Sequence, residues 1–91
     1  MRVLLSPIRM DGSIVYSFEN DKITATFNGQ TDVFDFSAFP DGKAESITTT
    51  ILKYSPITSA ERVNGELSVI VLNVIGEDAT EEERFPDWMV V

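Results

Sequence analysis

Residues 22–36 read KITATFNGQTDVFDF, in which Asn28-Gly29 joins two runs rich in β-branched and aromatic residues. The Asn-Gly pair accepts the positive φ angles that a two-residue hairpin turn requires at both central positions. In the first run Ile23, Ala25 and Phe27 alternate with polar residues, which is typical of a strand with one buried face. The stretch therefore predicts an antiparallel hairpin whose opposite face meets water or a partner.

Similar turn signals occur on either side of this hairpin. Asp11-Gly12 and Asn64-Gly65 also suit two-residue hairpin turns, and Asn20-Asp21 is a polar pair suited to a tight turn. The runs separated by these turns are residues 3–10, 13–19, 22–27, 30–36, 57–63 and 66–75. The first 36 residues are accordingly predicted to form a four-strand antiparallel meander.

The remaining segments complete an all-β prediction. Residues 66–75 are apolar on both faces, so we expect a central strand covered on both sides. Pro40 and Gly42 predict a loop after Phe36, and residues 47–52 form a further β-branched run. The expected fold is a single β domain over residues 1–91, a small antiparallel meander or sandwich of six or seven strands with a short C-terminal helical turn.

The acidic C-terminal segment, residues 76–91, differs in composition from the rest of the chain. It holds six acidic residues and one arginine, a net charge of −5 out of the total −8. Asp78 or Thr80 is expected to cap a short helical turn, and Pro86 to end it. The segment then closes on an apolar tip containing Phe85, Trp88, Met89 and Val91.

Two interpretations of this tip are open. Phe85 and Trp88 could fold back on the sheet and complete the core, since aromatic residues supply much of a small core. Alternatively, the tip and the acids before it bind a protein partner. The candidate partner-binding residues are Phe85, Trp88, Met89, Glu81, Glu82 and Glu83.

Composition argues against several classes of function. The 91 residues include no His and no Cys, which removes the commonest general base, the thiol nucleophile and the usual transition-metal ligands. We therefore expect no enzyme, no catalytic residues, no cofactor and no metal. The net charge of −8 disfavours ordinary nucleic-acid binding, and no apolar run approaches the ~20 residues of a membrane helix.

The carboxylates Asp32, Asp35 and Asp41 lie close to aromatic residues in the sequence. A paired-acid site or an oxygen-ligand cation site is conceivable there. A simpler interpretation places Asp32 and Asp35 on the water-exposed face of a strand and Asp41 in a turn with Gly42.

A family resemblance covers nearly the whole chain. It rests on SPIRMDGSIVYSFE at 6–19, DVFDF at 32–36, FPDG at 39–42 and DATEEERFPDW at 78–88. These stretches resemble small uncharacterised proteins of phages and prophages of Firmicutes, encoded near tail genes. The resemblance implies a phage-related setting and carries over no active site. The absence of Cys in so small a chain favours an intracellular site of synthesis, which in a phage-related setting is the host cytoplasm.

These observations lead to two functional hypotheses. The first is a non-catalytic phage accessory or structural protein that self-associates and takes part in tail or baseplate assembly, because a small sheet has edges to cover. Its acidic tails would point outward or contact cations such as Arg9, Arg62 and Lys53 on a neighbour. The alternative is an acidic inhibitor of a host defence or nucleic-acid enzyme. The expected partners are a second copy, a phage tail protein or a host protein.

Overall fold

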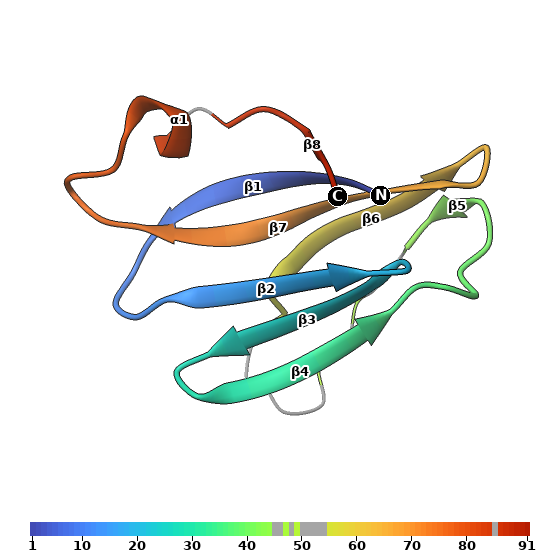
Figure 1. Ribbon diagram of the computed structural model, residues 1–91, viewed down its shortest axis with the longest axis horizontal. Helices are drawn as coiled ribbons and strands as arrows, with labels where there is room; N and C mark the ends of the chain where they lie inside the picture. The colour runs from blue at the N-terminus through green and yellow to red at the C-terminus, as the bar shows by residue number, and fades with distance from the viewer. Residues whose placement is uncertain (45–46, 48, 50–54, 85) are drawn as a thin grey trace.

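Two β-sheets pack against each other in the computed structural model, which describes residues 1–44, 47, 49, 55–84 and 86–91 (Figure 1). The larger sheet, sheet A, has the strand order β5-β6-β7-β1-β8. Its strands are β1 (Arg2–Arg9), β5 (Gly42–Lys43), β6 (Ile57–Val63), β7 (Glu66–Ile75) and β8 (Met89–Val90). The smaller sheet, sheet B, has the order β2-β3-β4, with β2 at Ile14–Glu19, β3 at Lys22–Phe27 and β4 at Gln30–Asp35. One short helix, α1 (Glu81–Arg84), lies between β7 and β8.

The all-β sandwich and the short C-terminal helical turn confirm the predicted fold class. The hairpin turns at Asn28-Gly29 and Asn64-Gly65 are also confirmed, since all four residues have positive φ. Of the eight strands in the described part of the chain, β5 and β8 have two residues each, too few to leave a pattern in the sequence. The β-branched run predicted over 47–52 lies mostly outside the described residues.

The predicted four-strand meander over residues 1–36 is wrong at its first strand. β1 does not pair with β2; it pairs in parallel with β7, from Arg2 beside Ser68 to Arg9 beside Ile75. The Asp11-Gly12 pair does not close a hairpin, because only Gly12 has positive φ there and a type I′ turn requires it at both central residues. Residues 10–13 instead carry the chain from sheet A to sheet B, whose three strands form the remaining meander.

Strand β7 is central, as predicted, with β6 and β1 as its neighbours. Its two faces differ in burial. Leu67, Val69 and Val71 are buried against sheet B, whereas the opposite face, at Ser68 and Ile70, is only half-buried. The expectation of a strand covered on both sides therefore holds for one face alone. The half-buried face, here called the outer face of sheet A, is available for a functional surface.

The core lies between the two sheets. Its buried apolar residues are Val3, Ile23, Ala25, Phe34, Ile57, Ala60, Leu67, Val69 and Val71. Asp32 shares the inner face of β4 with Phe34 and is 6% exposed, so its predicted place on the water-exposed face is wrong. Residues two apart on a strand share a face, and this alternation puts exposed Val33 and Asp35 outside instead.

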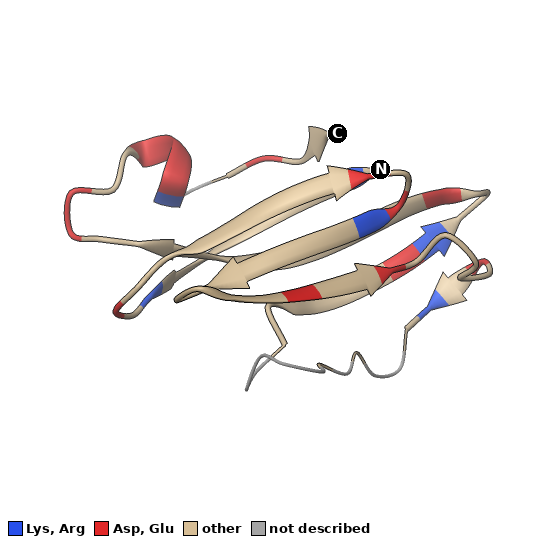
Figure 2. Cartoon of the chain, turned by 60° about the horizontal axis from the view of Figure 1, so that its bottom comes forward, with Lys and Arg blue, Asp and Glu red and all other residues tan. Residues whose placement is uncertain are grey.

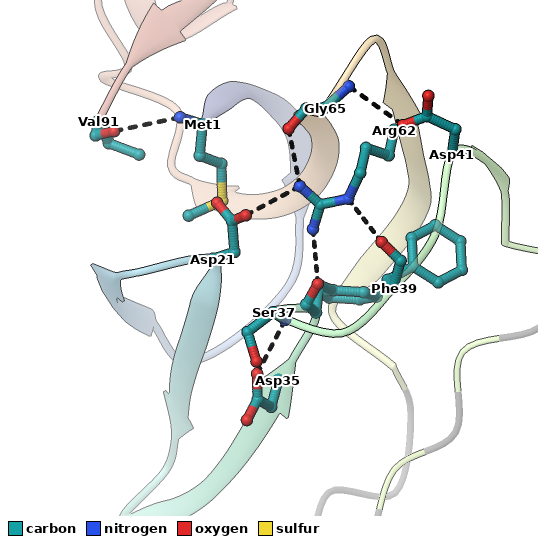
Figure 3. A network of polar contacts seen from close by, with 10 residues as sticks. Met1, Asp21, Asp35, Ser37, Phe39, Asp41, Arg62, Gly65 and Val91 are labelled. Carbon is teal, nitrogen blue, oxygen red and sulfur yellow. Dashed lines mark hydrogen bonds and ion pairs between the residues drawn. The ribbon is translucent and has the colours of Figure 1, made fainter.

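A buried arginine joins three connecting segments at one end of the sandwich (Figure 3). Arg62 on β6 donates hydrogen bonds to the carbonyls of Phe36 and Phe39, both at 2.6 Å, and to the Gly65 carbonyl at 2.9 Å. Its guanidinium also forms an ion pair of 3.0 Å with Asp21. The guanidinium is thus enclosed by this chain, so the expected role of Arg62 as a surface cation facing a neighbour is wrong.

A tyrosine links the two sheets and gives the domain a predicted pH dependence. The Tyr16 hydroxyl on β2 donates a hydrogen bond to the Leu72 carbonyl on β7, and burial raises the pKa of the phenol above its ordinary value of 10.0. The unfolded chain loses this proton near pH 10 while the folded chain keeps it, so stability should fall as the pH rises above that value.

We expect Tyr16→Phe to reduce this alkaline loss of stability. Between pH 8 and pH 11 the free energy of unfolding should fall by about 1 kcal/mol less in the variant than in the parent, because the phenol no longer titrates. Urea unfolding at the two pH values measures the difference. An equal fall in both proteins would show that the Tyr16 proton does not contribute.

Candidate functional site

The acidic C-terminal segment lies along β1 (Figure 1). After β7 the chain turns, forms α1 and returns as β8, which pairs antiparallel with β1, Val90 beside Arg2 and Met89 beside Val3. The Val91 amide also donates to the Met1 carbonyl at 2.9 Å. Because β8 reaches only these first residues, the rest of the outer edge of β1 has no strand partner among the described residues.

The residues of the tip are exposed together. Trp88 is 37% exposed, Met89 39%, Val90 83% and Val91 50%. The Trp88 ring is held by the Arg2 guanidinium, whose Cζ lies 5.0 Å from the ring centroid, a cation–π contact. The interpretation in which Trp88 completes the core is therefore wrong, because the side chain lies on the surface beside β1. Phe85 lies outside the described residues.

A shallow hollow opens on one side of Trp88, over the outer face of sheet A. It has a volume of about 660 Å³. Its lining includes Arg2, Glu61, Val63, Glu66, Ile70 and Trp88. Arg2 and Glu66 approach to 4.0 Å, an exposed ion pair that contributes little to stability. This outer hollow combines apolar and charged side chains of both signs.

A second depression, the tail groove, opens between the C-terminal segment and sheet A, and has a volume of about 460 Å³. Its apolar lining consists of Leu5 from β1 together with Pro86, Trp88 and Met89. Its charged lining is entirely acidic, from Glu82, Glu83 and Asp87, and Thr80 and Asn73 complete it. Figure 2 shows the acidic residues of α1 and of the segment that precedes β8. Trp88 lines both the outer hollow and the tail groove.

Hydrogen bonds fix two of the three groove carboxylates. Thr80 Oγ1 accepts from the Glu83 amide at 3.2 Å, and Glu83 Oε1 accepts from the Thr80 amide at 3.1 Å, which forms the capping box of α1. Asp87 Oδ1 accepts from the Trp88 amide at 2.8 Å. Arg84 is turned away and donates to the Glu77 carbonyl. Within the described residues, therefore, no cation of the segment lines the groove.

The structure does not bring the carboxylates of Asp32, Asp35 and Asp41 together in a common site. Asp32 and Asp35 lie on opposite faces of β4, and Asp41 accepts a hydrogen bond from the Gly65 amide at 3.1 Å. Hydrogen bonds from Ser37, first from its side chain and then from its backbone, lower the pKa of the exposed Asp35 carboxyl. Among the described residues, no three acidic side chains are grouped so that they could hold a metal ion.

The sequence prediction thus located part of the candidate surface. Glu82, Glu83, Trp88 and Met89 line the tail groove together, and Glu81 lies exposed on α1 outside it. Sequence reasoning missed Arg2, Leu5 and Asn73. The pairing of β8 with β1 brings Arg2 and Leu5 to the tip, and the parallel pairing of β1 with β7 places Asn73 beside β1. The polar residue Asn73 within the apolar run of β7 was the one local signal available.

The fold and this surface define a two-sheet β-sandwich domain with an exposed aromatic tip beside an acidic groove. Comparison of the chain with protein-family models, curated proteins and solved structures found no significant match. In the described part of the chain, no helix has the length and apolar character needed to cross a membrane.

Proposed function

We propose that this domain is a non-catalytic protein-binding module that self-associates, an accessory or structural protein of a phage that takes part in tail or baseplate assembly. The observation that carries the proposal is the exposure of four consecutive apolar residues, Trp88 to Val91, beside β1. Grouped apolar residues on a surface mark interaction sites more often than isolated ones do. The phage setting comes from the sequence resemblance.

The outer hollow supports contact between copies. Trp88, Ile70 and Val63 supply apolar surface there, and Arg2 with Glu66 supplies both signs of charge, which a second copy could match. The net charge of −8 opposes association at a distance, and salt screens this repulsion. Self-association is therefore expected to strengthen as salt rises.

Light scattering tests the self-association. At tens of micromolar, the intact chain should form a dimer or larger oligomer, more completely at 0.5 M than at 0.05 M salt. The double variant Trp88→Ser/Val90→Ser should weaken assembly by about tenfold or more, since two exposed apolar contacts are lost.

The matched control removes two apolar residues that are exposed on sheet B, Val15→Ser/Val33→Ser. This control should assemble like the parent. A parent chain that stays monomeric in every condition would disprove self-association. Equal weakening of both double variants would show that the interface between copies does not lie at the tip.

A second candidate function rests on α1, where Glu81, Glu82 and Glu83 are exposed in one turn. Such an acidic surface supports the hypothesis of an inhibitor that occupies the basic substrate channel of a host nucleic-acid enzyme. The test is competition: the domain should displace DNA from its target enzyme, and Glu81→Gln/Glu82→Gln should weaken that displacement.

A further inference from the structure

We infer that the tail groove binds an extended segment of another protein in which Lys or Arg side chains alternate with apolar ones. The inference rests on the proposed protein-binding function and names the chemistry of the partner. It depends on three properties of the groove: an apolar floor, a rim of one charge and an adjoining strand edge.

The apolar floor and the acidic rim of the groove suit different parts of one Lys or Arg side chain of the ligand. Leu5, Pro86, Trp88 and Met89 offer apolar contacts, while Glu82, Glu83 and Asp87 offer negative charge at the same groove. Lysine and arginine have long apolar stems and a charged end, so they can pack on such a floor and reach such a rim. An acidic or purely apolar segment would leave the three carboxylates without a counter-charge.

The strand edge favours an extended ligand. β8 occupies the edge of β1 only at Arg2 and Val3, and Leu5, which lines the groove, belongs to the part of β1 beyond β8. An open edge presents backbone donors and acceptors to which a further strand can add, as in many peptide complexes. Pro7 has no amide hydrogen, which limits the added strand to the part of β1 near Leu5.

The chain itself offers no such basic segment among its described residues. Arg62 is buried, Arg2 is held at Trp88 and Glu66, and Arg84 is bonded to the Glu77 carbonyl. The other described cations, Arg9, Lys22 and Lys43, lie on three different strands. The occupant is therefore assigned to a different protein instead of a second copy.

The single tryptophan of the chain reports on the groove directly, because Trp88 lines it. The probes are two capped octapeptides, one of alternating Lys and Val and one of alternating Glu and Val. The Lys-Val peptide should shift the Trp88 emission to shorter wavelength in a saturable titration that weakens as salt rises. The Glu-Val peptide should leave the emission unchanged.

The test variant, Glu82→Gln/Glu83→Gln/Asp87→Asn, removes the rim charge and keeps its hydrogen bonds. The side-chain amide introduced at position 83 can still complete the capping box with Thr80, and the one introduced at position 87 can still accept from the Trp88 backbone amide. An unchanged Tm will verify folding. Affinity for the Lys-Val peptide should fall by about tenfold, as expected for three exposed ion pairs.

The matched control, Asp11→Asn/Glu19→Gln/Asp35→Asn, makes the same change in net charge at exposed positions outside both the tail groove and the outer hollow. It should bind the Lys-Val peptide within about twofold of the parent. Equal losses in both variants, or equal binding of both peptides, would overturn the inference. Because Trp88 also lines the outer hollow, self-association by itself can change the Trp88 emission, so the protein concentration is kept constant through every titration. The light-scattering result tests the proposed self-association separately, because no peptide is present there.

Discussion

Replacement of Arg62 by alanine is expected to lower the free energy of unfolding by roughly 3–4 kcal/mol. The change removes four hydrogen bonds at once: the Phe39 and Gly65 carbonyls and the Asp21 carboxylate lose the Arg62 donor, and the Phe36 carbonyl keeps only the Phe39 amide. An unpaired polar group costs its desolvation free energy, and the loss of one partner of a buried ion pair is among the larger single effects known. Stability of a small domain is only ~5–15 kcal/mol, so the variant should be close to unfolding.

Urea unfolding of three variants distinguishes the loss of the Arg62 hydrogen bonds from the loss of a positive charge. Arg62→Lys keeps the charge but cannot place donors along the guanidinium fork, so it should lose most of the same stability. Arg9→Ala removes an exposed arginine and should change stability by less than about 0.5 kcal/mol. A loss below about 1 kcal/mol for Arg62→Ala would contradict the assignment of Arg62 as the centre of this network.

The second large effect is expected at Gly12. Gly12, Gly29 and Gly65 all have positive φ, at 101°, 80° and 81°, so valine is strained at each. At Gly12 an added Cβ would also lie 2.8 Å from Asn28 Oδ1 and 3.2 Å from Phe27 Cε2, whereas nothing lies within 4 Å at Gly29 or Gly65. Strain and overpacking together should cost about 3 kcal/mol or more at Gly12, against roughly 1–2 kcal/mol at the other two.

Thermal or urea unfolding of the three valine variants gives the order directly. Gly76→Val is the matched control, since Gly76 has no positive φ and no neighbour within 4 Å of an added Cβ. Gly12→Ala, which omits the two valine methyl groups, should lose less than Gly12→Val. If Gly12→Val were no less stable than Gly29→Val, the close contact between Gly12 and the Asn28 turn would contribute nothing measurable to the free energy of unfolding.

Only the part of the candidate site that the C-terminal segment contributes could be predicted from the sequence. Acidic residues followed by an apolar tip indicated a partner-binding segment, and Thr80 with Glu83 carries the capping-box spacing that starts α1. The sequence pattern did not reveal what stands opposite this segment. Leu5 and Arg2 are more than 80 residues from Trp88 along the chain, and their contact with the tip depends on the pairing of β8 with β1.

By itself the sequence determined the local structure: where strands alternate, where Asn-Gly pairs turn the chain, and that β7 is a central strand. Such signals are local because φ preferences and side-chain alternation act over a few residues. Only the tertiary structure decided that β1 pairs with β7 instead of β2, that Arg62 is buried, and that Trp88 lies on the surface. Strand order depends on which apolar faces bury each other best across the whole chain, and local turn preferences do not encode that competition.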